Sequence, residues 1–202
     1  MTGEATMTRD IWISSDFHFN HENILKFRDS TTGVHVRGDR FQSVTEMNEY
    51  MIEQHNRTVK PGDIFYTLGD VFMGEGSREW FKKNWPRLNG RKRLIVGNHD
   101  DIKFLSSGGF CQKVQMWRMF PEFGLMFSHV PLHISSMYKH SIDRPLFGIH
   151  GHIHQNSSPV GPYRNVCVEK TDYSPVHIET LAEEAKKYFN DQWETDRPLL
   201  QP

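Results

Sequence analysis

Five short polar motifs constrain the fold of this chain more than any other feature, because each directly follows a short apolar run. Such runs, bounded by Gly and Pro, are typical of buried strands. The motifs are Asp16-Phe17-His18, Gly69-Asp70, Gly97-Asn98-His99-Asp100, Ser128-His129 and Gly151-His152-Ile153-His154. If the strands lie side by side in one or two sheets, their carboxyl ends bring the motifs to a common rim, where open α/β sheets bind ligands.

The side chains of these motifs are of the kinds that bind metal ions. Imidazole and carboxylate together suit Mn, Fe, Zn, Ni or Co. Because none of the five motifs contains a Cys, a closed structural zinc site is disfavoured. The candidate ligands are Asp16, His18, Asp70, Asn98, His129, His152 and His154. They are too many for one ion and suit two divalent ions, about 3.5–4 Å apart, that share one carboxylate. Asp70 is the natural bridge, and we favour Mn²⁺ as the metal.

With these motifs in this order, the chain resembles the calcineurin-like metallophosphoesterases, over roughly residues 10 to 180. The resemblance implies a four-layer α/β/β/α sandwich of two mixed sheets with flanking helices. It implies that Asp16, His18, Asp70 and His154 hold one metal, and that Asp70, Asn98, His129 and His152 hold the other. It also implies that His99 is not a ligand and faces the substrate.

Two departures from the family pattern bear on the substrate. Protein phosphatases of this type carry Asp-Arg-Gly after the bridging Asp, whereas Asp70 is followed by Val71-Phe72-Met73-Gly74, which disfavours a phosphoprotein substrate. The first motif continues as Phe19-Asn20-His21-Glu22-Asn23-Ile24 in place of the usual Gly. In this longer form the chain is similar to small, single-domain members from bacteria and phages.

Size and composition narrow the class of protein. The 202 residues suffice for a single domain, 1–202, with loose ends at 1–9 and 197–202. The 24 basic and 25 acidic residues give a net charge of −1, which disfavours binding along extended nucleic acid. No apolar run approaches the ~20 residues that span a bilayer, and the first residues lack a signal-peptide core. The two cysteines, Cys111 and Cys167, indicate reduced thiols, so we expect a cytoplasmic protein without a membrane partner.

These features predict an enzyme, a phosphoric ester hydrolase in which a metal-bridging hydroxide attacks phosphorus. We favour a phosphodiesterase acting on small nucleotides such as 2′,3′-cyclic nucleotides, because a compact chain of near-neutral charge suits a small ester better than a polymer. A phosphomonoesterase or protein phosphatase of the same family is the alternative, and a DNA nuclease would require a basic groove. A non-catalytic protein-binding scaffold is disfavoured, because the chain keeps His99 and every candidate ligand.

A catalytic pair is expected at His99 and Asp100. The leaving alkoxide needs a proton, and His99 is the natural donor if Asp100 raises its pKa and accepts its other N–H. Residues 28–42 are predicted to form a long loop, either a flap over the metals or a solvated surface loop. The candidate substrate contacts are Arg28 and Arg40 in this loop, with His21 and His133 elsewhere.

Three further elements are predicted in the second half of the chain. The patterns indicate single strands over Val114–Met119 and Asn165–Glu169. They also indicate a closing helix over Thr180–Asn190, in which Thr180 and Glu183 form the capping box.

Overall fold

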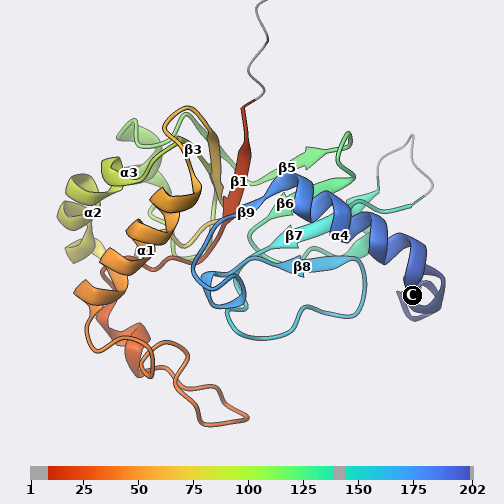
Figure 1. Ribbon diagram of the computed structural model, residues 1–202, viewed down its shortest axis with the longest axis horizontal. Coiled ribbons are helices and arrows are strands. Elements are labelled where there is room, and N and C mark those ends of the chain that lie inside the picture. Colours follow the sequence, from red (N-terminus) through yellow and green to blue (C-terminus); the bar gives the residue numbers. More distant parts are fainter. Residues whose placement is uncertain (1–8, 139–143, 201–202) are drawn as a thin grey trace, which may run out of the picture.

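The computed structural model describes residues 9–138 and 144–200, which form two β-sheets and their flanking helices (Figure 1). Strand order is β4-β3-β2-β1-β9 in the first sheet and β5-β6-β7-β8 in the second. The first sheet is parallel except for β9, and the second is parallel except for β5. Both sheets are therefore mixed, and the predicted α/β fold of two mixed sheets with flanking helices is confirmed.

The elements have the following bounds. The first sheet contains β1 (Ile11–Ser14), β2 (Ile64–Thr67), β3 (Arg91–Ile95), β4 (Lys113–Gln115) and β9 (Val176–His177). The second contains β5 (Trp117–Phe120), β6 (Leu125–Ser128), β7 (Phe147–His150) and β8 (Tyr163–Asn165). The α-helices are α1 (Val44–Thr58), α2 (Arg78–Asn84), α3 (Ile102–Ser107), α4 (Ile178–Asp191) and α5 (Trp193–Asp196). The 3-10 helices are η1 (Glu22–Lys26), η2 (Glu75–Ser77), η3 (Trp85–Arg87), η4 (Ile134–Met137), η5 (Val168–Lys170) and η6 (Arg197–Leu200).

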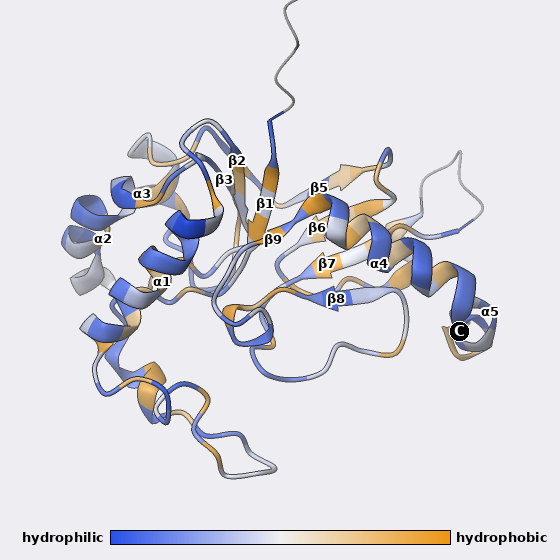
Figure 2. Ribbon diagram, viewed as in Figure 1, coloured by the Kyte–Doolittle hydropathy of each residue, from blue (hydrophilic) through white to orange (hydrophobic). Residues whose placement is uncertain are grey.

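Alternation along the strands divides the hydrophobic residues between the two faces of each sheet, since successive side chains point to opposite sides. Ile13 and Ile95 of the first sheet join Phe127 and Ile149 of the second in one buried cluster between the sheets. Phe65 and neighbouring residues face the other way, toward the helices. The strands accordingly carry most of the strongly hydrophobic segments in Figure 2.

Helices cover the outer face of the first sheet, where α1, α2 and α3 lie together (Figure 1). The side chain of Ser43 accepts a hydrogen bond from the Glu46 N–H and so caps the N-terminus of α1. Met47 and Met51 of this helix are fully buried, as expected of packing residues. On the second sheet, η4 and Trp193 of α5 cover the strand face that Met126 occupies.

Three predictions about the second half of the chain are wrong in detail. Val114–Met119 is not one strand, because β4 ends in the first sheet and β5 begins in the second, with Met116 at the crossing. The strand predicted over Asn165–Glu169 ends at Asn165, and the chain then turns into η5. The closing helix α4 begins at Ile178, where the His177 side chain, and not Thr180, accepts an N–H of the first turn.

Residues 28–42 form a long loop that extends away from the two sheets and is called the 28–42 excursion below (Figure 1). Arg28 and His35 make an antiparallel bridge across it, and the Asp29 side chain accepts the N–H groups of Thr31 and Thr32. Of the predicted loose ends, residues 1–8 and 201–202 lie outside the described residues, and Arg197–Leu200 forms η6. Within the described ranges, no helix is long and apolar enough to cross a membrane.

Candidate metal centre

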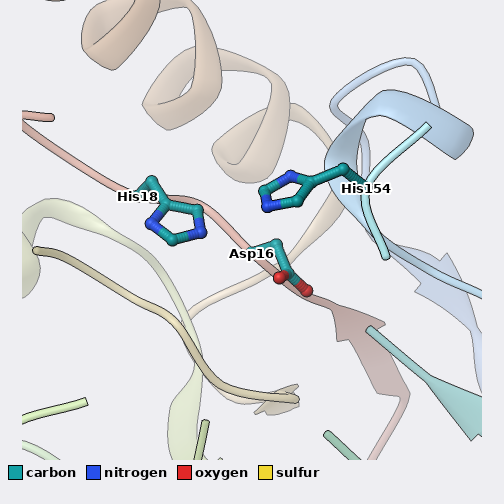
Figure 3. Close-up of side chains that lie close together, drawn as sticks. All are labelled: Asp16, His18 and His154. Carbon is teal, nitrogen blue, oxygen red and sulfur yellow. The ribbon is translucent and has the colours of Figure 1, made fainter. Parts of the chain in front are cut away.

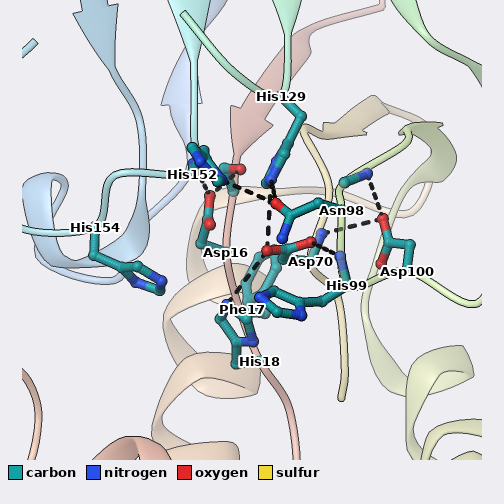
Figure 4. A network of polar contacts seen from close by, with 12 residues as sticks. Asp16, Phe17, His18, Asp70, Asn98, His99, Asp100, His129, His152 and His154 are labelled. Carbon is teal, nitrogen blue, oxygen red and sulfur yellow. Dashed lines mark hydrogen bonds and ion pairs between the residues drawn. The ribbon is translucent and has the colours of Figure 1, made fainter. Parts of the chain in front are cut away.

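The ends of five strands deliver the candidate ligands to one place (Figure 4). Asp16, Asp70 and Asn98 follow β1, β2 and β3, which are parallel neighbours, so their carboxyl ends share one edge. His129 follows β6, and His152 follows β7, in the sheet that packs against the first. Side chains separated by more than a hundred residues thereby meet at the junction of the two sheets.

One group of ligand atoms joins Asp16, His18 and His154, whose side chains lie close together (Figure 3). Their ligand atoms all lie within 4.8 Å of one another. The rings of His18 and His154 are stacked, with centroids 5.1 Å apart. Two imidazoles and a carboxylate at this spacing form a mixed N and O donor set for a divalent ion.

A second group joins Asn98, His129 and His152. The Asn98 Oδ1 atom lies 2.8 Å from His129 Nε2 and 2.9 Å from His152 Nδ1. His129 donates its Nδ1–H to the Leu68 carbonyl at 2.7 Å, so Nε2 is the ring atom that faces the amide oxygen and is placed to bind a metal. A cation bound by both atoms would satisfy two acceptors that otherwise face each other.

Asp70 lies between the two groups. Its Oδ2 atom is 3.6 Å from His18 Nε2 on one side and 3.5 Å from His129 Nε2 on the other. Its Oδ1 atom accepts the backbone N–H of His99 at 2.9 Å. Burial raises the pKa of Asp70, and the Asp16 carboxylate adds to this effect, whereas a bound cation would favour the ionised form.

Several buried atoms that could bind a metal make no hydrogen bond within the protein, and this tests whether metal ions fit here. Asp16 Oδ1 and both ring nitrogens of His18 are buried without a hydrogen bond. Buried polar atoms are nearly always paired, so such atoms need another partner. Burial holds the pKa of His18 well below its ordinary value, so its ring is neutral and offers a lone pair. This donor set fits divalent metal ions.

The backbone at the ligands is strained. In the described part of the chain, five of the eight non-glycine residues with positive φ are candidate ligands. Their φ angles are 59° at Asp16, 48° at His18, 51° at Asp70, 73° at His152 and 50° at His154. Conformations of this kind cost about 1–3 kcal/mol each and cluster at functional sites.

Two motif glycines are required by the close approach of the ligand strands. A Cβ atom at Gly97 would lie 2.2 Å from Asp70 Oδ1. A Cβ atom at Gly151 would lie 2.0 Å from Ser15 Oγ and 2.2 Å from Asp16 Oδ2. Neither site leaves room for a side chain without displacing a candidate ligand.

Neighbouring groups fix which atom of a ligand faces the centre. Asp16 Oδ2 accepts hydrogen bonds from the His152 N–H at 2.9 Å, the Ser15 hydroxyl at 2.5 Å and the Cys167 thiol at 3.2 Å. This leaves Asp16 Oδ1 as the free oxygen. His154 donates its Nδ1–H to Glu169 at 3.0 Å, which leaves Nε2 for a metal. Such second partners set the tautomer and basicity of metal-binding histidines.

A buried ion pair that no sequence pattern indicates lies beneath this layer. Arg37 is 1% exposed, and its Nε and Nη2 atoms contact Glu169 Oε1 at 2.8 and 2.7 Å. The same guanidinium donates to the carbonyls of Phe17 and Asp16 at 2.7 and 2.6 Å. Burial alone would raise the pKa of Glu169, but the Arg37 charge and the His154 hydrogen bond outweigh it and lower the pKa to about 2. Arg37 thus anchors the 28–42 excursion beneath the centre.

The structure differs from the expected pairing of His99 with Asp100. The two Asp100 oxygens accept the backbone N–H groups of Gly97 at 2.8 Å, Val71 at 3.0 Å and Asp70 at 3.1 Å. Asp100 therefore holds the backbone around Asp70 and does not orient the His99 ring. Burial raises the pKa of Asp100 to about 6. The His99 side chain is exposed, and its ring lies 5.7 Å from that of His18.

The four candidate substrate contacts lie in different places. The His21 ring is 5.8 Å from that of His18 and so lies beside the centre. Arg28 donates to the Gly33 carbonyl, and Arg40 donates to Asp172 and Tyr50, so both are engaged around the excursion. His133 caps η4 and lines a separate pocket with Trp193.

Comparison with known proteins gives a consistent result. The sequence model of the family described as calcineurin-like phosphoesterase matches residues 9–199. An uncharacterized protein of Methanocaldococcus jannaschii is 30% identical over 186 residues, which cover 89% of this chain and 93% of that protein. The gene 66 protein of Mycobacterium phage D29 is 30% identical over 93 residues, covering 45% of this chain and 40% of that protein. A solved structure of a protein of unknown function from Aquifex aeolicus has the same fold, with a TM-score of 0.65 and 22% identity over 88% of this chain and all of that chain.

Proposed function

The chain belongs to the calcineurin-like phosphoesterase family, and on that premise we propose that it is a phosphodiesterase of small nucleotides, 2′,3′-cyclic nucleotides among them. Family membership and the candidate ligand groups make it a metal-dependent phosphoesterase. The preference for diesters, the nucleotide and the use of manganese are our proposal.

The position of Asp70 supports the two-metal centre on which this proposal rests, because one carboxylate oxygen lies within 3.6 Å of a histidine from each ligand group. We assign one metal to Asp16, His18, Asp70 and His154, and the other to Asp70, Asn98, His129 and His152. When bound, two such ions activate water and neutralise charge on the phosphoryl oxygens.

Other residues of the chain take defined parts in the reaction. His99 donates the proton that the leaving oxygen needs, since its side chain is exposed beside the centre and makes no hydrogen bond among the described contacts. Its backbone N–H orients the Asp70 carboxylate. Asp100 is a positioning residue, because its hydrogen bond from the Gly97 N–H fixes the turn that carries Asn98 and His99.

The state of the nearby arginines supports a diester. Arginine–phosphate pairs are frequently bidentate, so an arginine without other partners beside the metals would suit the extra charge of a phosphomonoester dianion. The arginines of the 28–42 excursion already have protein partners: Arg37 binds Glu169 and two carbonyls, Arg28 donates to the Gly33 carbonyl, and Arg40 donates to Asp172 and Tyr50. A diester carries a single negative charge, so two metal ions meet its needs without an added cation.

A panel of esters tests the proposal. With Mn²⁺ added, the protein should hydrolyse bis-p-nitrophenyl phosphate and 2′,3′-cyclic AMP at least about tenfold faster than p-nitrophenyl phosphate and AMP, and a chelator should abolish all four activities. His129→Asn should lose activity, and His133→Asn, a histidine away from the centre, is its matched control. Faster hydrolysis of the monoesters would refute the diester preference. If the metal-loaded protein hydrolysed none of the four esters, the proposal that it is an enzyme would be refuted.

A further inference from the structure

An apolar pocket of about 420 Å³ opens directly beside the second ligand group, and Asn98 and His129 form part of its wall. Four of its other lining residues are large hydrophobic side chains with high exposure. Ile102 is 50% exposed, Met116 61%, Trp117 55% and Val130 37%. A gathering of exposed apolar side chains of this kind marks a binding site.

These side chains reach the pocket from separate parts of the fold. Ile102 begins α3, Met116 is the crossing between the sheets, and Trp117 begins β5. Trp117 pairs in register with Ser128, the residue before His129, so the indole is held next to a ligand strand. The Ser128 hydroxyl donates to the Val130 carbonyl at 2.7 Å, which fixes the turn behind His129. The pocket is therefore built from secondary structure and is continuous with the candidate metal centre.

The chemistry of the walls indicates a flat, uncharged group. The one charged side chain among the lining residues, Asp100, has its oxygens bound to three backbone N–H groups. An exposed indole offers a stacking surface, and the thioether of Met116 makes favourable contacts with aromatic rings. The volume lies in the range of small-molecule sites, about 300–1,000 Å³.

We propose that this pocket binds the nucleobase of the substrate, with Trp117 as the stacking surface, while the phosphate lies against Asn98 and His129. The inference rests on the proposed function and specifies its substrate: an ester that carries an aromatic base. Because every base has a π-face, stacking on Trp117 selects for the presence of a base more than for its identity.

The test compares 2′,3′-cyclic AMP with methyl ribofuranoside 2,3-cyclic phosphate, which has the same reacting ring and no base. Trp117→Ala should lower kcat/KM for the nucleotide at least about fivefold, a typical loss for one stacked base, and leave the abasic ester within about twofold. Trp117→Phe should retain most of the nucleotide activity. Tyr138→Ala is the matched control, because Tyr138 is 46% exposed and lines a different pocket. Equal losses on both esters, or no loss, would overturn the proposal.

A binding experiment separates this inference from the proposed function. Adenosine, which has no phosphate, should bind the chelator-treated protein and quench tryptophan fluorescence, and Trp117→Ala should weaken that binding by a similar factor while Tyr138→Ala does not. If neither ester is hydrolysed, the proposed function fails, and unchanged adenosine affinity in Trp117→Ala overturns the pocket assignment independently. A homodimer that dissociates in Trp117→Ala, with adenosine affinity unchanged, would assign the patch to a second copy of the chain and also overturn it.

Discussion

Replacing Glu169 by Gln should destabilise the protein far more than its conservative size change suggests. The substitution keeps the shape of the side chain and removes its charge. Arg37, which is 1% exposed and contacts Glu169 through two nitrogens, would then be a buried cation without a carboxylate. Breaking a buried pair by removing one partner typically costs about 3–5 kcal/mol.

The lowered pKa of Glu169 indicates a loss of folding free energy of similar size. It falls from an ordinary value of 4.5 to about 2 in the folded protein, a difference of about 2.5, and each pH unit corresponds to about 1.36 kcal/mol. The ionised carboxylate therefore contributes about 3 kcal/mol at neutral pH. Because the folded pKa is the lower one, this stabilisation is present above pH 4.5 and is lost as pH falls toward 2. The gap between wild type and Glu169→Gln should therefore narrow as pH falls from about 4.5 toward 2.

Urea denaturation in the presence of a chelator measures the effect, because bound metal would otherwise add to the free energy of unfolding. Glu49→Gln is the matched control. Glu49 also pairs with an arginine through two contacts, at 2.5 and 2.7 Å from Arg87, but its side chain is 52% exposed. Exposed pairs contribute about 0–1 kcal/mol. A loss of stability in Glu169→Gln no larger than that in Glu49→Gln would show that the buried pair contributes no more than the exposed one.

Three further predictions test other parts of the account. Gly97→Ala should weaken metal binding at least about tenfold in equilibrium dialysis, because the added Cβ would meet Asp70 Oδ1. Gly62 has open space around it, so Gly62→Ala should leave metal affinity unchanged. Equal affinities in the two variants would contradict the role of Gly97. His99→Asn should keep both metals and slow the release of an alcohol leaving group more than that of p-nitrophenol, and equal losses would count against proton donation. Burial lowers the pKa of His55 from 6.5 to about 4, so stability should fall by up to about 3 kcal/mol as pH drops from 6.5 to 4. His55→Gln should flatten that stretch of the pH–stability curve, and an unchanged slope would be inconsistent with a neutral buried ring.

The sequence was sufficient to predict the sheets and the meeting of the motifs, because these depend on local order along the chain. Asp16, Asp70 and Asn98 each stand two or three residues beyond an apolar strand, and parallel strands place such positions at one edge. β6 and β7 lie in the second sheet, and its packing against the first was an expectation that came from the family resemblance.

Features that depend on long-range or exact backbone geometry could not be predicted in this way. Arg37 and Glu169 are 132 positions apart, and neither belongs to a motif, so no local pattern indicates their ion pair. The crossing at Met116 is hidden because β4 and β5 follow each other almost without a break.

Asp100 is an intermediate case, since it is adjacent to His99 but its carboxylate turns back onto the N–H of Gly97. An aspartate three residues after a motif glycine could have suggested such a turn, because short polar side chains often bind nearby backbone groups.

The anomalous scattering of manganese in a crystal grown with Mn²⁺ would show whether Asp70 bridges two metal ions. Two peaks are expected about 3.5–4 Å apart with the Asp70 carboxylate between them, one beside His18 and His154 and the other beside Asn98 and His129. A single peak, or two peaks that do not share Asp70, would contradict that bridge.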